Sequence, residues 1–154
     1  MNLEARVLRE GVVREQWSDR IPFRGHRLVT ALHPTTIEIT TEDHLTERGD
    51  CIIGVAAEKG CAQLAEGVKA GIRRPSAKVL LRFVVGADTF DVEAQGDPRL
   101  TLAHPHEIVV RRSDYISDRT IAVRADAAAK DVPRRMIAAL RRPATVGFLE
   151  VSVS

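Results

Sequence analysis

Several short stretches of this chain alternate hydrophobic and polar residues, which is the pattern of half-buried β-strands. In residues 35–40, for example, Ile37 and Ile39 fall on one face of an extended segment. The same kind of pattern, or a run of β-branched residues, predicts strands at 51–57, 78–85, 89–94, 107–112, 120–125 and 146–153, and a weaker strand or hairpin within 4–17. The total is about ten strands.

Two other stretches place apolar residues at helical spacing. The first stripe consists of Cys61, Leu64, Ala65, Val68 and Ile72, and the second of Val132, Met136, Ile137 and Leu140. We expect Asp131 to cap the second helix, since Pro133 is tolerated only in a first turn. Each stripe is followed by Arg-Arg-Pro, where we expect the helix to end because proline cannot continue it and cations favour its negative end.

The second half of the chain repeats the first. With His33 aligned on His104, residues 25–85 match 96–153 with 16 identities in 58 pairs, and one gap removes Gly49, Asp50 and Cys51 from the second copy. A period near 70 residues is too long for a solenoid. We therefore predict two homologous halves, related by a pseudo-two-fold axis, within one domain that spans residues 1–154.

Strands dominate over helices in this pattern. The predicted fold class is therefore mainly β, with a sandwich or a closed barrel of about ten strands and two helices that cover its ends or one face.

Composition narrows the class of protein. Hydrophobic residues make up 44% of the chain, enough for a real core. We expect no membrane span and no signal peptide, and two cysteines among 154 residues favour a cytoplasmic protein with reduced thiols. A net charge of +2 does not by itself indicate nucleic-acid binding, and 4% aromatic residues argue against a base-stacking surface.

Two long motifs carry a resemblance to a known family. The segments "HPTTIEITTEDHLTERGDCIIGV" and "RRSDYISDRTIAVRADAAAKDVPRRMIAALRRP" resemble the archaeal family called "domain of unknown function 371", over nearly the whole chain from about Phe23. The resemblance implies an archaeal source and a β-rich, jelly-roll-like sandwich, and it implies no activity. Where this chain has Gly96-Asp97-Pro98, the family tends to carry Gly-His-Pro, which weakens any proposal that needs a histidine there.

Six polar residues occur as pairs in both halves, namely His33 with His104, Asp43 with Asp114, and Arg48 with Arg119. Pairs kept in both copies are explained most simply by structure. We expect the histidines to shape a turn between two strands with the imidazole hydrogen-bonded to backbone, the aspartates to cap a turn, and the arginines to pair with them inside each loop. The alternative is that all six line one ligand-binding groove.

The loop before residue 52 offers a second candidate site. Asp50 and Cys51 lie in the apparent insertion, and His44 is replaced by Tyr115 in the second copy. A thiolate nucleophile needs a nearby base and positive charge, which His44, His33 and Arg48 could provide. Alternatively Cys51 is a small buried hydrophobe. His104 and His106 have a spacing that two metal ligands could use, but nothing completes a tetrahedral set, so we predict no metal site and identify no cofactor.

Arginine contributes 19 of the 23 basic residues, and four arginines stand at the predicted helix ends. They are Arg73, Arg74, Arg141 and Arg142. They could contact phosphate groups or simply stabilise the helix termini.

These features favour a cytosolic binding module for an anionic small molecule or a nucleic-acid backbone such as RNA. One alternative is an enzyme that uses Asp43, His44, Asp50 and Cys51. Another is a structural or assembly subunit, and a homo-oligomer is compatible with all three.

Overall fold

The computed structural model describes residues 17–46 and 48–154. The strand or hairpin expected within residues 4–17 lies almost wholly outside this part of the chain. Within it there are eight strands, two α-helices and two short 3-10 helices, so the mainly β class with two helices is confirmed. The count of about ten strands is not reached in these residues.

The elements follow the same order in each half of the chain. The first half contains β2 (Ser18–Arg24), β3 (Thr36–Thr40), β4 (Ile52–Gly54), η2 (Cys61–Gln63), α3 (Glu66–Ile72) and β5 (Lys78–Val85). The second half contains β6 (Asp88–Gln95), β7 (Glu107–Arg111), β8 (Thr120–Ala122), η3 (Ala129–Asp131), α4 (Arg134–Leu140) and β9 (Val146–Val153).

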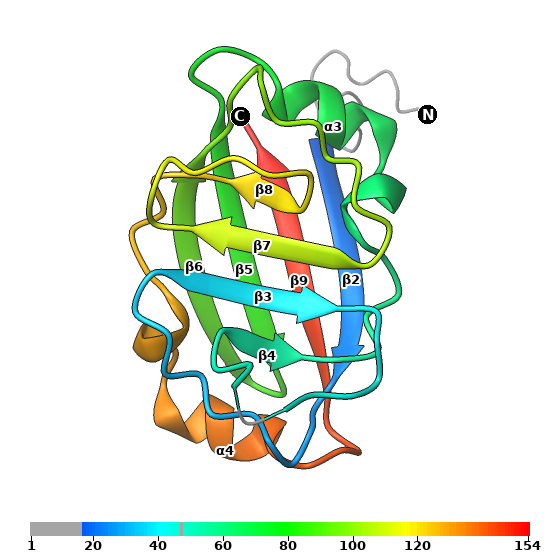
Figure 1. Ribbon diagram of the computed structural model, residues 1–154, viewed down its shortest axis with the longest axis vertical. Coiled ribbons are helices and arrows are strands. Elements are labelled where there is room, and N and C mark those ends of the chain that lie inside the picture. The colour runs from blue at the N-terminus through cyan, green and yellow to red at the C-terminus, as the bar shows by residue number, and fades with distance from the viewer. Residues whose placement is uncertain (1–16, 47) are drawn as a thin grey trace.

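The strands form two four-stranded sheets in the orders β2-β9-β5-β6 and β4-β3-β7-β8. Figure 1 shows them as two layers, with β4-β3-β7-β8 in front and α3 and α4 at opposite ends. Single backbone bridges join the sheets at both edges, between Arg24 and Val55 and between Gln95 and Val123. Because these bridges do not extend into ladders, the closed barrel considered above is wrong. The jelly-roll topology stays a prediction.

Each sheet takes two strands from each half, so the halves meet in the middle of both layers. β3 pairs antiparallel with β7 in one sheet, and β5 pairs antiparallel with β9 in the other. The halves also exchange equivalent hydrogen bonds, since Ala62 N–H donates to the His104 carbonyl and Lys130 N–H donates to the His33 carbonyl. The common origin of the halves stays a prediction.

The core lies between the two sheets. Ile37 and Ile39 of β3 and Ile108 and Val110 of β7 are all at most 1% exposed, and they alternate with residues on the outward face. Full burial of such a side chain contributes about 1.5–3 kcal/mol. Since each half supplies only part of this apolar surface, neither half buries its strands alone.

The helices are shorter than their apolar stripes suggest. Cys61 belongs to η2, while Leu64 and Ala65 have extended backbone angles and separate η2 from α3. In the second half the N-cap of α4 is Pro133, and the predicted cap at Asp131 is wrong. The Asp131 carboxylate instead accepts a hydrogen bond from Ala128 N–H, which closes η3. Among the described residues, no helix has the length and apolarity that crossing a membrane requires.

A close backbone contact joins the end of each helix to a glycine that follows a strand of the other half, with α3 against Gly96 after β6 and α4 against Gly25 after β2. A Cβ atom added at Gly96 would lie 2.0 Å from the Ile72 carbonyl oxygen, and one at Gly25 would lie 2.2 Å from that of Arg142. Backbone atoms cannot move aside cheaply. We therefore expect Gly96→Ala to lower the free energy of unfolding by at least ~1–3 kcal/mol, the usual cost of overpacking. Guanidinium denaturation measures it, with the exposed neighbour Gln95→Ala as control. Equal stability of the two variants would contradict the contact.

Candidate functional site

The outward face of the β4-β3-β7-β8 sheet carries a buried carboxyl group. Glu38 points away from the core between Ile37 and Ile39, yet it is only 6% exposed. Its register partner on β7 is Val109. Under the offset of 71 residues these two positions are equivalent, so the predicted pseudo-two-fold axis passes between them. Glu38 therefore stands near the centre of this face.

Charged and polar side chains from both halves surround Glu38. The Cys51 thiol donates to Glu38 Oε1 at 3.5 Å, and the Arg119 guanidinium donates to Glu107 Oε1. Burial, followed by the negative charge of Glu107, raises the pKa of Glu38 to about 7. We call Glu38, Cys51, Glu107, Arg111 and Arg119 the axis cluster.

Arg111 is the member of the axis cluster without a carboxylate partner among the described residues. Its Nε donates to Thr120 Oγ1 at 2.8 Å and its Nη2 to Ser117 Oγ at 3.3 Å, while its Cζ lies 4.9 Å from the centre of the Tyr115 ring. Burial, and then the like charge of Arg119, lowers the pKa of Arg111. Two guanidinium groups are thus held near one another.

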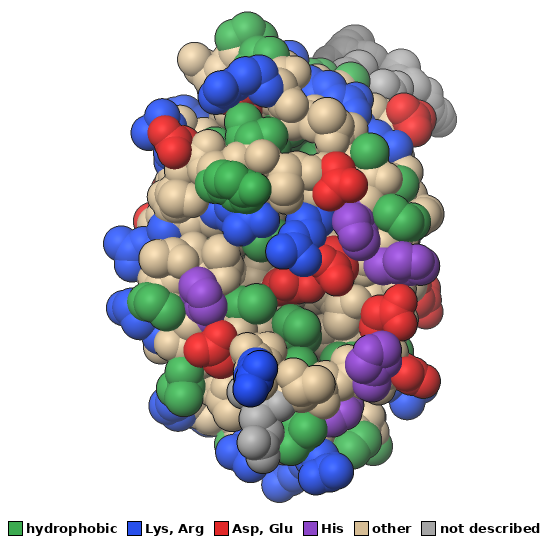
Figure 2. All heavy atoms as spheres, viewed as in Figure 1, with side chains coloured by type: hydrophobic (Ala, Val, Ile, Leu, Met, Phe, Trp, Pro, Cys, Tyr) green, Lys and Arg blue, Asp and Glu red, His purple; other side chains and the backbone are tan. Residues whose placement is uncertain are grey.

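Figure 2 looks directly onto this face of the molecule. Acidic and basic side chains meet near its middle, over β3 and β7, and histidines lie around them. The side chains of Arg119 and Glu107 are 44% and 23% exposed. A ligand in solvent can therefore reach the axis cluster.

The two halves differ at the outward positions near the axis and agree at the inward ones. Inward, Ile37 matches Ile108 and Ile39 matches Val110. The outward pairs, given in the order first half then second half, are Thr36 with Glu107, Glu38 with Val109, Thr40 with Arg111, and Cys51 with Arg119. The inward side chains build the shared core, whereas the outward ones are free to specialise.

The paired histidines shape turns, as predicted. His33 Nδ1 accepts hydrogen bonds from the Thr35 and Thr36 N–H groups, each at 3.2 Å. His104 Nδ1 accepts the equivalent bonds from His106 N–H at 3.1 Å and Glu107 N–H at 3.0 Å. The expectation that these imidazoles bond to backbone is confirmed. The turn after His104 places Glu107 at the start of β7.

The predicted pairing of the loop aspartates and arginines is wrong. Arg119 pairs with Glu107, and Asp114 lies 3.5 Å from Arg124 instead. In the first half Asp43 is 91% exposed, with His44 at 3.8 Å, and Arg48 is exposed and pairs with no carboxylate among the described residues. The physical reason is register, because Arg119 is the last loop residue before β8, where its carbonyl accepts from Val109 N–H and its guanidinium group reaches Glu107 of β7.

The apparent insertion of Gly49, Asp50 and Cys51 is also misplaced. The Asp50 carbonyl accepts from Leu32 and His33 N–H, as the Asp118 carbonyl accepts from Ala103 and His104 N–H. The Cys51 carbonyl accepts from Glu38 N–H, as that of Arg119 accepts from Val109 N–H.

These matched bonds make Asp50 equivalent to Asp118 and Cys51 equivalent to Arg119. The three extra residues of the first half therefore lie between Glu42 and Gly49. Asp50 therefore has a counterpart in Asp118, and its expected absence from the second half is wrong.

Neither cysteine carries the properties of a nucleophile. Burial, followed by the charge of Glu38, raises the pKa of Cys51 to about 12, and burial followed by Asp118 raises that of Cys61 to about 12. Both thiols are free and stay protonated at neutral pH. Cys61 is fully buried, as predicted for a core residue.

The remaining candidates lie apart from the axis cluster. His44 Nδ1 is 3.9 Å from Glu42 Oε1, and His106 Nδ1 is 4.0 Å from Glu42 Oε2. Within residues 17–46 and 48–154, no three His, Cys, Asp or Glu side chains are placed to hold a metal ion. The two Arg-Arg pairs follow α3 and α4, which occupy opposite ends of the molecule in Figure 1. They cannot form one phosphate site.

Sequence patterns pointed to Arg119 and Cys51 but missed Glu38, Glu107 and Arg111. These three residues stand at alternating strand positions, where an exposed polar face is the ordinary expectation. A comparison of outward positions between the halves would have revealed their divergence. Their proximity depends on β3–β7 register, which the alternation does not specify.

Comparisons with known proteins agree with the sequence resemblance. The family model described as "Domain of unknown function (DUF371)" matches residues 21–154. The chain is also similar to the "Uncharacterized protein MJ0206" of Methanocaldococcus jannaschii, with 37% identity over 121 residues that cover 79% of this chain and 89% of the relative.

The raised pKa of Glu38 makes the stability of the fold depend on pH. The folded-state pKa of about 7 lies above the ordinary glutamate value of 4.5, so between these pH values the folded protein holds a proton that the unfolded chain has lost. The stability that Glu38 contributes should be fully present below about pH 4.5, be lost as the pH rises to about 7, and not change further above that pH.

We expect Glu38→Gln to remove this component, which is worth about 2–3 kcal/mol between pH 5 and pH 8. Urea unfolding at both pH values measures it. Glu42→Gln, which changes an exposed carboxyl group, is the control. If wild type and Glu38→Gln lost the same stability over this range, Glu38 would not hold the proton.

Proposed function

We propose that this protein is a binding module for a small anionic ligand, which is bound at the axis cluster. The chain belongs to the family described as "Domain of unknown function (DUF371)", and that description names no activity. A carboxylate or phosphate group of that ligand contacts the guanidinium groups of Arg111 and Arg119 on the outward face of the β4-β3-β7-β8 sheet.

The observation that carries this proposal is the unbalanced pair of guanidinium groups. Arg119 already shares the Glu107 carboxylate. Arg111 is held by neutral hydroxyl groups, and burial, followed by the charge of Arg119, lowers its pKa. A bound anion would relieve this repulsion. Guanidinium groups also suit such a ligand, because their planar N–H donors match two oxygens at once.

Glu38 gives the axis cluster a charge that depends on pH. Below its pKa of about 7 it is neutral, and the cluster carries one carboxylate against two guanidinium groups. Above that pH a second negative charge appears beside the anion. The titratable and charged groups that face Glu38 are Glu107, Cys51, Arg111 and Arg119. An anion is therefore bound more tightly at acid pH.

The proposal includes an origin by duplication of residues 25–85 as 96–153. Equivalent backbone bonds support it, such as Ala57 N–H to the Thr40 carbonyl and Ala125 N–H to the Arg111 carbonyl. A duplicated fold keeps its inward faces for the core and specialises near the axis. A cytoplasmic location, inferred from the free cysteines, belongs to the same proposal.

The Glu38–Glu107 pair favours a second candidate, proton-transfer catalysis. A carboxyl group with a pKa of about 7 beside a second carboxyl group that is paired with an arginine suits a general acid or base. In this alternative the Asp43, His44, Asp50 and Cys51 loop plays no part. Hydrolysis of phosphate and glycosyl esters by wild type, lost in Glu38→Gln and retained in Glu42→Gln, would favour catalysis over binding alone.

Anion binding can be measured with inorganic phosphate, pyrophosphate and citrate as probes. We expect at least one probe to raise the Tm of wild type at pH 5.5, since a ligand at 100 times its Kd adds about 2.7 kcal/mol of stability. The increase should be smaller at pH 8. Arg111→Gln should abolish it because the unpaired guanidinium is gone.

The control is Arg82→Gln, which removes an arginine paired with Asp91 on the other sheet. The same loss of charge there should leave the effect intact. The proposal fails if no probe stabilises wild type, or if the two variants respond to the probes equally.

A further inference from the structure

Four arginines gather at the α4 end of the molecule, far from α3. Arg24 and Arg27 flank the end of β2, while Arg141 and Arg142 follow α4. Two backbone bonds hold these segments together, from Gly25 N–H to the Thr145 carbonyl at 2.9 Å and from His26 N–H to the Leu140 carbonyl at 2.8 Å. All four arginines are exposed, and none is in an ion pair within the described residues. We call them the basic end.

The corresponding arginines at the α3 end serve the fold. Arg73 donates to the carbonyls of Leu100 and Thr101 and so anchors that loop. Arg74 lies over the Trp17 ring, with its Cζ 4.3 Å from the ring centre. These contacts account for the first Arg-Arg pair.

At the α4 end another residue performs the anchoring task. Arg134 donates to the carbonyls of Thr30 and Ala31, which belong to the loop equivalent to the one that Arg73 holds. Arg141 is aligned with Arg73, but within the described residues Arg134 and not Arg141 donates to this loop. The positions equivalent to Arg24 and Arg27 are Gln95 and Pro98. The positive charge of the basic end therefore exceeds what the repeat needs.

We propose that the basic end docks on the phosphate backbone of a double-stranded nucleic acid. Exposed guanidinium groups contact phosphate oxygens through paired N–H donors, and such contacts position a protein without reading bases. A cavity of about 470 Å³ beside the patch is lined by Arg24 and His26 but by no Phe, Tyr or Trp of the described residues. The cavity therefore provides no aromatic ring of these three types for unpaired bases to stack on, which favours a duplex over a single strand.

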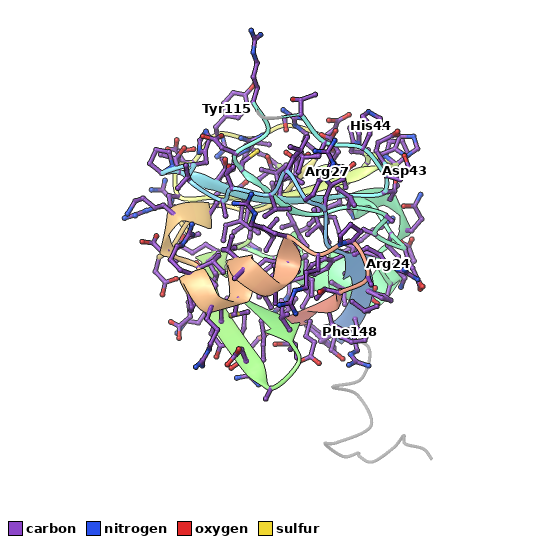
Figure 3. All side chains as sticks on the ribbon, turned by 90° about the horizontal axis from the view of Figure 1, so that it is seen from below. Arg24, Arg27, Asp43, His44, Tyr115 and Phe148 are labelled. Carbon is purple, nitrogen blue, oxygen red and sulfur yellow. The ribbon has the colours of Figure 1, made fainter. Side chains whose placement is uncertain are left out.

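The carboxylates around the basic end favour discrete phosphates over a membrane surface. Asp43 and Glu58 line the same cavity as Arg24, and both are exposed. Figure 3 looks onto this end and shows Arg24, Arg27 and Asp43 on the same side of α4. A continuous anionic lipid surface would meet these carboxylates as well as the arginines. A nucleic-acid backbone can pass over the arginines alone.

Fluorescence anisotropy with labelled RNA and DNA duplexes of the same sequence tests this proposal, at salt concentrations from 50 to 200 mM. We expect wild type to bind at least one duplex, with log affinity falling linearly against log salt. The variant Arg141→Gln/Arg142→Gln should bind at least about tenfold more weakly at 50 mM salt. Its salt slope should be smaller by about 2, because two phosphate contacts are lost.

The matched control is Lys78→Gln/Arg99→Gln, which removes two positive charges outside the basic end and should keep the wild-type slope. Arg111→Gln should also bind normally, which separates this surface from the axis cluster. Binding to RNA, to DNA or to both supports the proposal. It is overturned if wild type binds neither duplex at 50 mM salt, or if the two double variants weaken equally. Arg141/Arg142-dependent binding to phosphatidylserine vesicles alone would overturn it in favour of a membrane.

Discussion

The antiparallel pairing of β3 with β7 is the contact on which the rest of the structure depends. It joins the two halves in the middle of one sheet and sets which outward residues become neighbours. Because Glu38 faces Val109 in this register, the equivalent positions of the halves meet at the axis. A shift of β3 by one residue would turn Ile37 and Ile39 outward and Glu38 into the core, and so would take Glu38 away from the rest of the axis cluster.

That pairing confines a carboxyl group where water is scarce. A buried charge is costly unless it is paired and hydrogen-bonded, and the nearest donor to Glu38 is a weak one, the Cys51 thiol. The carboxylate beside it, Glu107, already pairs with Arg119. Retention of a proton is the remaining way to reduce the cost, which explains why the pKa of Glu38 reaches about 7. The electrostatic character of the face thus follows from packing rather than from net charge.

Most of the fold could be predicted from the sequence because alternation and helical spacing are local signals. β5 and β9 have the predicted bounds, and both helices end at Arg-Arg-Pro. The errors arose where local patterns were ambiguous. Proline is tolerated both at an N-cap and in a first helical turn, so the sequence did not show that Pro133 itself, and not Asp131, caps α4. The site was harder to predict, because aligning Arg48 with Arg119 put the gap at Asp50, whereas backbone hydrogen bonds place it earlier. Only the register of paired strands reveals such a shift.

The strand order of the β2-β9-β5-β6 sheet constrains how the chain folds. β2, the first strand of the described residues, pairs along its whole length with β9, which spans Val146–Val153. Both neighbours of β9, namely β2 and β5, come from the first half. They can pair with β9 only after it has been synthesised. During synthesis these strands cannot complete their sheet until residue 153 has left the ribosome. Contacts this distant in sequence make folding slow, and a chain interrupted before β9 would expose two apolar strand edges at once.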